Sequence, residues 1–319
     1  MNRPRIDIVK YRWLWFSISL AILVPGLVGI VICLFTFHAP LRPGIDFTGG
    51  SILQYQFEQP VSLEPVRQIL NTTGFPGSQV QLASIAGHEV VVMRTKAIEN
   101  ESEKRNLDQA LTSQLGKFKV LSVDKVSGTI GPELLSSGLT ALVFTFAMMV
   151  AYISYRFKLD YAVCAIIALF HDALALCGIF ALLGIILGTE VDSLFISAIL
   201  TVIGFSVHDT IVVFDRIREN AKYVGSKAID SATGKDYKKT FGDVANDSVN
   251  QTLTRSIYTS LTVIITLSVL YLLGGVTTRD FVLAMLIGII SGTYSSIFNA
   301  SCLLVLWREL KSKRRVKVA

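Results

Sequence analysis

The chain has 319 residues, of which 51% are hydrophobic and 17% are charged, and its formal net charge is +6 at pH 7. Soluble domains average about 25% charged residues, so this composition excludes an ordinary soluble domain and indicates an integral membrane protein. The four cysteines all lie in apolar stretches, so the sequence predicts neither a disulfide framework nor a zinc site.

Six apolar stretches are long enough to cross a bilayer, which takes about 20 residues each. The first stretch follows basic residues, but it is longer than the apolar part of a signal peptide and no cleavage-like site follows it. We therefore interpret it as a retained membrane span. The expected spans are residues 13–37, 134–155, 159–187, 191–214, 251–273 and 281–307.

Lysine and arginine are concentrated on one side of the expected spans. Nineteen of them lie in the N-terminal segment 1–12, between the second and third spans, in a loop at about 215–250, and in the tail 308–319. The two other short connections hold only Arg279. Because basic residues favour the cytoplasmic side, we expect both termini and the basic loop in the cytoplasm, with the tail against anionic lipid.

The segment 38–133, between the first two spans, is then expected outside the cytoplasm as a folded domain. Its sequence predicts a strand at SILQYQFEQ, a helix at SLEPVRQILNTTG, two strands within QVQLASIAGHEVVVMRT, a helix at ESEKRNLDQALTSQLG and a strand at FKVLSVDKVS. This βαββαβ order is typical of a ferredoxin-like α+β fold. The expected fold is therefore a six-helix polytopic membrane protein, 134–307 holding helices 2–6, with one small extracytoplasmic domain.

Ionisable residues inside membrane spans are expensive, so each indicates a functional site by default. Asp209 lies in the fourth span, with His208 beside it. His171 and Asp172 are adjacent near the centre of the third span, and Arg255 lies near the start of the fifth. We interpret His171 and Asp172 either as a polar packing pair or as a secondary proton relay.

Five polar residues recur along the fifth span at helical spacing. They are Thr252, Arg255, Thr259, Thr262 and Thr266. Their offsets of 3, 4, 3 and 4 place them on one helix face, which we expect to face protein or water rather than lipid. Asp209 is then the natural partner of Arg255, because the two lie at similar depth on consecutive antiparallel spans.

Two interpretations of this acid and this arginine remain open. In the first they form a static ion pair that fixes helix packing, or Arg255 reaches the cytoplasmic surface while the threonines bond to their own backbone. In the second, Asp209 binds and releases a proton, since burial favours its neutral form and a nearby arginine favours its charged form.

Small residues at a spacing of four mark the sixth span. Gly288, Gly292 and Ser296 predict close helix packing. Elsewhere the sequence has no phosphate-binding loop, no nucleophile-elbow serine and no metal-binding histidine cluster. We therefore expect no enzymatic activity, no cofactor, no metal and no nucleic-acid partner.

Four motifs carry a resemblance to a known family. They are GIDFTGG at 44–50, IGFSVHDTIVVFDRIREN at 203–220, SVNQTLTRSIYTSL at 248–261 and MLIGIISGTYSSIF at 285–298. With these motifs the chain resembles the SecF subunits of the SecD–SecF complex of bacterial protein secretion, over nearly its whole length. That family belongs to the resistance–nodulation–division superfamily of proton-driven transporters.

The resemblance implies roles for particular residues. Asp209 is implied to carry a proton and Arg255 to be its partner. His208 stands where the family more often has asparagine, so it joins Thr252, Thr259 and Thr262 as a secondary polar candidate. Superfamily members usually have twelve spans in two similar halves, which implies a second six-span chain, SecD, packed against this one.

The resemblance also implies a function and a location. The chain is expected to be a non-enzymatic subunit of the plasma (inner) membrane that, with SecD, uses the proton motive force to promote late steps of polypeptide translocation. The implied partners are SecD, the SecYEG channel, YajC, membrane lipid and the unfolded polypeptide. The alternatives are a small-molecule exporter of the same superfamily, which the small external domain disfavours, and a scaffold without proton coupling.

Overall fold

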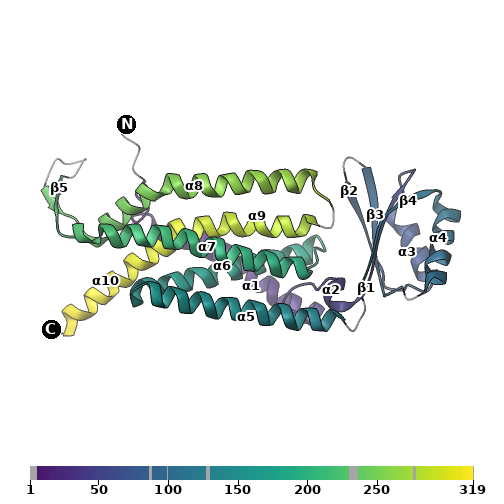
Figure 1. The fold of residues 1–319 in the computed structure, drawn as a ribbon, viewed down its shortest axis with the longest axis horizontal. Helices are drawn as coiled ribbons and strands as arrows, with labels where there is room; N and C mark the ends of the chain where they lie inside the picture. The colour runs from purple at the N-terminus through teal and green to yellow at the C-terminus, as the bar shows by residue number, and fades with distance from the viewer. Residues whose placement is uncertain are drawn as a thin grey trace.

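The computed structural model describes residues 6–85, 88–98, 100–126, 130–229, 236–275 and 278–318. A bundle of long helices lies at one end of the molecule and a small α/β domain at the other (Figure 1). In the described residues, six helices are long and apolar enough to cross a membrane. They are α1 (Arg12–Phe37), α5 (Ile130–Arg156), α6 (Leu159–Ile186), α7 (Ser193–Asn220), α8 (Phe241–Leu273) and a last helix made of α9 (Arg279–Tyr294), the π-helical segment η3 (Ser295–Ala300) and α10 (Ser301–Val318).

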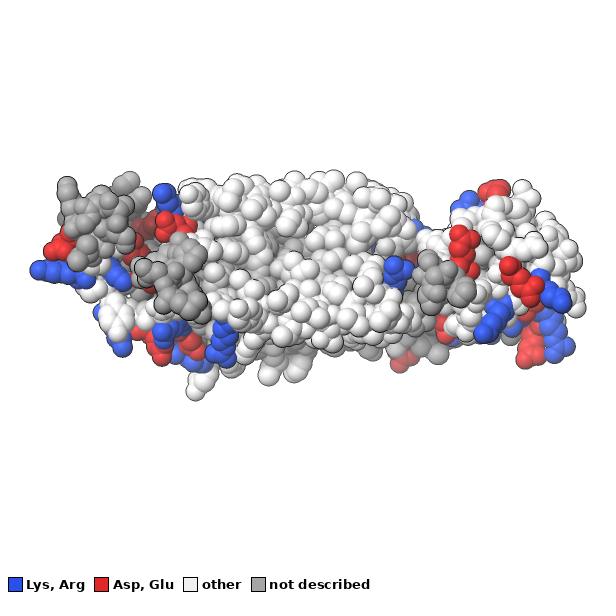
Figure 2. All heavy atoms as spheres, turned by 90° about the horizontal axis from the view of Figure 1, so that it is seen from above, with Lys and Arg blue, Asp and Glu red and all other residues white. Residues whose placement is uncertain are grey.

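The surface of the bundle matches a membrane environment. On the face drawn in Figure 2, the charged side chains gather at the two ends of the molecule and the middle of the bundle carries none. Large apolar side chains of the bundle, such as Val143 and Phe144 of α5, are exposed. An apolar band of this kind is stable against lipid tails, so the predicted polytopic helical membrane protein is confirmed.

The α/β domain has the predicted βαββαβ order. Its elements are β1 (Gly50–Phe57), α3 (Leu63–Thr72), β2 (Gln79–Ile85), β3 (His88–Thr95), α4 (Glu101–Leu115) and β4 (Phe118–Val126). The strands form one antiparallel sheet in the order β2-β3-β1-β4, which is the ferredoxin-like arrangement. Figure 1 shows α3 and α4 on the side of the sheet that faces away from the bundle.

Alternation along the strands builds the core of this domain. Leu53 and Tyr55 of β1 point to the helix side of the sheet and are fully buried. Leu107 and Leu111 of α4 are spaced by four residues, so they lie on one face of the helix and pack against this side of the sheet. The Tyr55 hydroxyl donates to Asp108 at 2.6 Å, which satisfies the one polar atom that this tyrosine brings into the core.

The GIDFTGG motif forms the entry to the domain. A short helix, α2 (Ile45–Thr48), is followed by Gly49 and Gly50, whose φ angles are 73° and 140°. Residues that carry a side chain rarely have φ angles in this range. A Cβ atom on Gly50 would also lie 2.7 Å from the carbonyl oxygen of Thr95. Glycine at position 50 therefore lets β1 start in close contact with β3.

Helix α1 packs on α6 through glycine. A Cβ atom on Gly26 would lie 2.8 Å from the Cα atom of Gly178, so the two backbones touch.

The last helix packs on α7 through small residues. A Cβ atom on Gly288 would lie 2.4 Å from the side chain of Val202, and one on Gly292 would lie 3.1 Å from the side chain of Ser206. The small residues of the sixth span thus lie directly against α7.

Substituting Gly26 should destabilise the bundle. We expect Gly26→Ala to lower the free energy of unfolding by about 1–3 kcal/mol, because the added methyl group meets backbone that has no room to move. Gly204→Ala on α7 is the matched control, since nothing lies within 4 Å of its new Cβ atom. Thermal melting of the purified protein in detergent measures both, and equal melting temperatures would contradict the packing assigned to Gly26.

The connection between α7 and α8 is more structured than the sequence predicted. Helix α7 continues to Asn220, and α8 starts at Phe241, ten residues before the expected start of the fifth span at 251. The cause is a capping box, in which Thr240 and Asp243 each satisfy the backbone N–H of the other. Between the helices lie the short 3₁₀ helix η1 (Ala221–Tyr223) and a hairpin of β5 (Lys227–Ile229) and β6 (Asp236–Lys238).

Candidate functional site

Asp209 is buried in the bundle where α7 meets α8 and α9. Only 3% of the residue is exposed, and its Oδ2 atom accepts no hydrogen bond. The hydroxyl groups of Ser260 on α8 and Thr293 on α9 are polar neighbours of the carboxyl group, and they are 2.7 Å from each other. A carboxylate charge at such a position has little compensation, so the site favours a change of charge over a permanent ion.

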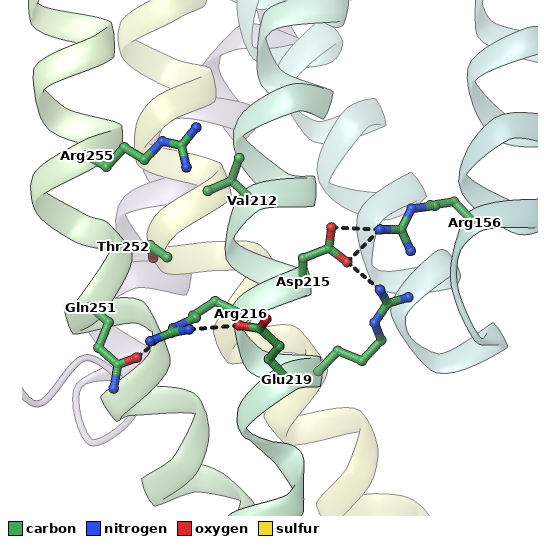
Figure 3. A pocket seen from close by; sticks show the side chains of 9 residues that line it. Arg156, Val212, Asp215, Arg216, Glu219, Gln251, Thr252 and Arg255 are labelled. Carbon is green, nitrogen blue, oxygen red and sulfur yellow. Dashed lines mark hydrogen bonds and ion pairs between the residues drawn. The ribbon is translucent and has the colours of Figure 1, made fainter.

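Arg255 does not form the expected ion pair with Asp209. Its residue is exposed, and Figure 3 shows its guanidinium group directed towards Val212 of α7 with no interaction drawn to it. Ser260 is the α8 residue beside the acid, and five positions on a helix correspond to about 140° of rotation. Arg255 therefore lies on a different face of α8, which is why the pairing inferred from sequence is absent from this conformation.

The polar line that α8 buries also differs from the expected one. It consists of Ser248, Thr252, Ser256 and Ser260, which are all buried and spaced by four residues. Of the expected stripe, only Thr252 is buried, whereas Thr259, Thr262 and Thr266 are exposed. Their hydroxyl groups donate to backbone carbonyls of α8, at 2.7 to 3.0 Å. This is the alternative in which the threonines bond to their own helix.

His171 and Asp172 lie in a second polar cluster, between α6, α7 and the π-helical segment. Asp172 is 1% exposed, and its Oδ1 atom is 2.9 Å from Nδ1 of His171. Ser206 of α7 donates a hydrogen bond to the other carboxylate oxygen. Both oxygens of Asp172 are therefore satisfied, in contrast to Asp209, so its geometry is that of a fixed structural group.

The second cluster continues on both sides of Asp172. The Oγ atom of Ser296 donates to the carbonyl oxygen of Ser206 at 3.1 Å and lies 2.9 Å from Oγ1 of Thr210. On the other side, Asn299 donates to Ser19 of α1, and its Nδ2 atom is 3.4 Å from Nε2 of His171. Ser296 thus makes polar contacts with α7 in addition to the packing inferred from sequence.

The two acids are connected through α7. Ser206 of α7, which donates a hydrogen bond to Asp172 of α6, lies three residues before Asp209, which is about one turn of helix. His208, between them in sequence, is exposed on another side of the helix. The structure therefore places Asp209 about one turn from the α7 partner of Asp172 and leaves His208 exposed.

A polar groove at one end of the bundle was missed by the sequence analysis. It has a volume of about 570 Å³ and lies between α5, α7 and α8 (Figure 3). Asp215 is 2.9 Å from both Arg156 and Arg218, and Arg216 is 2.7 Å from Glu219. Arg255 also lines this groove. Arg156 and Asp215 pair between α5 and α7, which no spacing pattern within one span could reveal, whereas the other two pairs lie within α7 at a spacing of three residues.

The described part of the chain has no candidate metal site. No group of three or more His, Cys, Asp or Glu side chains there is arranged to hold a metal ion.

Comparisons with known proteins match SecD/SecF proteins over nearly the whole chain. A family model described as the C-terminal part of the protein export membrane protein SecD/SecF matches residues 106–310, and one described as the SecD/SecF GG motif matches residues 34–61. The chain is 45% identical over 317 residues to the protein translocase subunit SecF of Thermobaculum terrenum, covering 95% of this chain and 94% of that one. It is 39% identical over 321 residues to the SecF subunit of Synechocystis sp., covering 97% and 96%.

Solved structures of SecDF have the same fold. One from Thermus thermophilus, described as a translocon-associated membrane protein, superimposes with a TM-score of 0.77 at 31% identity, covering 96% of this chain and 39% of that one. A second SecDF structure, in a super-membrane-facing form, gives a TM-score of 0.66 at 29% identity, covering 100% and 41%. The chain thus spans about two fifths of those longer chains. It belongs to the SecD/SecF family of protein-export membrane proteins, with SecF translocase subunits as its full-length relatives.

Proposed function

We propose that this chain uses the proton motive force to promote late steps of polypeptide translocation, and that Asp209 is the group that binds and releases the proton. The observation that carries the proposal is the buried carboxyl group of Asp209, whose Oδ2 atom has no hydrogen bond. Two hydroxyl groups beside it can donate to the charged form or accept from the neutral form. Both protonation states therefore have partners within the site.

The energy of one proton suits such a role. A membrane potential contributes about 2.3 kcal/mol per charge for each 100 mV, so a driving force on the order of 200 mV supplies roughly 4–5 kcal/mol per proton. Shifting a two-state equilibrium from 1:99 to 99:1 takes about 5.5 kcal/mol. One or two protons per cycle are enough to drive a change of conformation.

A partner subunit of the SecD type is the second part of the proposal. The exposed face of α8 carries Arg255, Thr259, Thr262 and Thr266 inside a membrane span, which is unfavourable against lipid. The solved SecDF relatives contain more than half of their chain outside the region that this chain covers. A second half packed on α8 and on the groove beside α7 would shield these polar groups from lipid.

The remaining features of the proposal rest on the likeness to the SecF translocase subunits. The chain acts without enzymatic chemistry, in the bacterial inner membrane, next to the SecYEG channel and YajC, on an unfolded polypeptide. The experiment that tests it is translocation into membrane vesicles with and without a proton gradient, comparing the parent chain with Asp209→Asn. A scaffold without proton coupling would respond to neither change, and a small-molecule exporter would leave translocation unaffected.

Orientation gives a separate prediction. We expect the α/β domain outside the cytoplasm and the β5–β6 hairpin inside, because basic residues gather at the hairpin end of the bundle. In spheroplasts, Ser113→Cys on exposed α4 should react with a membrane-impermeant thiol reagent, and Ser226→Cys before β5 should react only after lysis. Labelling of Ser226→Cys in intact spheroplasts, with Ser113→Cys protected, would reverse the orientation.

A further inference from the structure

One of the contacts between the α6–α7 loop and the α/β domain is made by a nearly buried acid. Glu190 in this loop has its Oε2 atom 2.9 Å from Nε of Arg94 on β3, and its Oε1 atom 3.7 Å from Nε of Arg42, which follows α1. The three side chains are only 10%, 17% and 15% exposed. Burial raises the pKa of Glu190, while Arg94 and Arg42 act in the opposite direction.

Arginine contacts extend this link over two strands of the domain. Arg94 donates from Nη1 to the side chain of Gln81 on β2 at 3.1 Å, and Arg42 donates to Gln79 on the same strand. The Nε atom of Arg94 makes no hydrogen bond, so its contact with Glu190 is an ion pair held by charge and burial. Because β3 is an interior strand of the sheet, a displacement of Arg94 is passed to the strands on both sides.

Backbone hydrogen bonds join the same loop to the entry of the domain. The N–H group of Gly44 donates to the carbonyl oxygen of Val191 at 2.7 Å, and the N–H group of Val191 donates to that of Arg42 at 2.9 Å. The carboxylate of Asp46 in α2 accepts from the backbone N–H of Ser193 at 3.0 Å. The start of α7 and the start of the domain therefore form one hydrogen-bonded unit.

Helix α7 connects this unit to the proton site. The helix begins at Ser193, where Asp192 caps it by accepting from the N–H of Phe195 at 2.9 Å, and it carries Asp209 sixteen positions later. At a rise of about 1.5 Å per residue, roughly 24 Å of helix separates Ser193 from Asp209. A rigid helix with a capped end transmits a rotation or a shift at Asp209 to Glu190.

Part of the boundary between the sheet and the bundle is not filled by side chains. A cavity of about 820 Å³ separates the sheet from the bundle, lined by Gln54 and Val92 of the sheet and by Tyr271 and Leu283 of the bundle. Figure 1 shows the sheet standing at the end of the bundle with its helices on the far side. The domain is therefore attached at a few places, and the charged contact at Glu190 is one of them.

We propose that Glu190, paired with Arg94 and Arg42, is a coupling residue that makes the α/β domain follow the movement of α7. The proposal rests on the proposed function, because it takes a change at Asp209 as the source of that movement. Glu190 itself touches neither the proton site nor a substrate. Its role is to keep the loop and β3 together while α7 changes position.

A distance measurement tests the link without reference to protons. Spin labels are attached at Ser113→Cys on α4 and Tyr155→Cys at the other end of α5, both exposed, in the full-length chain with its native cysteines replaced by alanine. We expect one narrow distance distribution in the parent and a broader or shifted one in Glu190→Gln and in Arg94→Gln. Glu101→Gln, which removes an exposed ion pair with Arg105 on α4, is the control and should leave the distribution unchanged. An unchanged distribution in Glu190→Gln overturns the proposal.

Translocation then tests the coupling. In vesicles holding the full complex, we expect Glu190→Gln and Arg94→Gln each to reduce the gradient-dependent part of translocation at least several-fold. The double variant should be no worse than either single one, since both remove the same link. If Asp209→Asn abolishes the gradient effect and Glu190→Gln retains it, the coupling role is wrong and the proposed function stands. If Asp209→Asn also retains it, the proposed function fails and the coupling proposal fails with it.

Discussion

Asp209→Asn should abolish the stimulation of translocation by a proton gradient while leaving the protein folded and assembled. Asparagine has nearly the same shape as aspartate but does not exchange a proton at physiological pH. Little stability is lost, because the Oδ2 atom of Asp209 makes no hydrogen bond that the substitution would break. Translocation of a precursor into inverted vesicles, measured with and without a gradient, should show basal transport near the parent value and no gradient-dependent increase.

The matched control for this variant is Asp172→Asn on α6, which neutralises a second buried acid, the one that accepts a hydrogen bond from Ser206 of α7. Thermal melting of both variants separates a loss of function from a loss of folding. A full gradient response in Asp209→Asn would show that the acid contributes to packing alone, as the static interpretation of the sequence holds.

Asp172→Ala should strongly destabilise the bundle, and Asp172→Asn should not. Alanine leaves Ser206 and His171 without their partner, and each buried group that loses its hydrogen bond costs about 1–3 kcal/mol. We therefore expect a loss of about 2–5 kcal/mol for alanine. Asparagine keeps an acceptor oxygen for Ser206 and offers an N–H group to Nδ1 of His171, which accepts it in the tautomer protonated at Nε2, so the variant should retain most of the stability.

The same pair of variants decides between the two interpretations of His171 and Asp172. A packing pair predicts that Asp172→Asn melts near the parent temperature and keeps its gradient response. A secondary relay predicts a folded Asp172→Asn protein that no longer responds to the gradient. The saturated hydrogen bonding of Asp172 favours the first outcome, and the second outcome would contradict it.

Hydrophobic length and strand alternation made most of the fold predictable. The ferredoxin-like domain has short elements with clear periodicity and turns between them, so local sequence determined each one. The early start of α8 carried a readable signal as well, since Thr240 and Asp243 have the spacing of a capping box. The sequence analysis assigned this segment to a basic loop from its charge alone and missed the capping box.

The neighbours of Asp209 could not be predicted in the same way. On α8, the buried line through Ser256 and Ser260 and the exposed line through Arg255 and Thr259 are one residue apart, and both have helical spacing. Periodicity identifies a stripe but does not say which of two adjacent stripes faces the bundle. The contacts of Asp172 with Ser206 and of Glu190 with Arg94 join residues far apart in sequence, so only the folded chain shows them.

The most direct test of the account is the protonation of Asp209 in the assembled complex. Infrared difference spectroscopy in lipid, recorded as the pH is changed, detects the carbonyl stretch of a protonated carboxyl group, and Asp209→Asn identifies the contribution of this residue. The account predicts a carboxyl band that appears and disappears with pH in the parent, persists in Asp172→Asn, and is absent from Asp209→Asn. A parent spectrum in which no band assigned to Asp209 responds to pH would contradict its role as the proton-binding group.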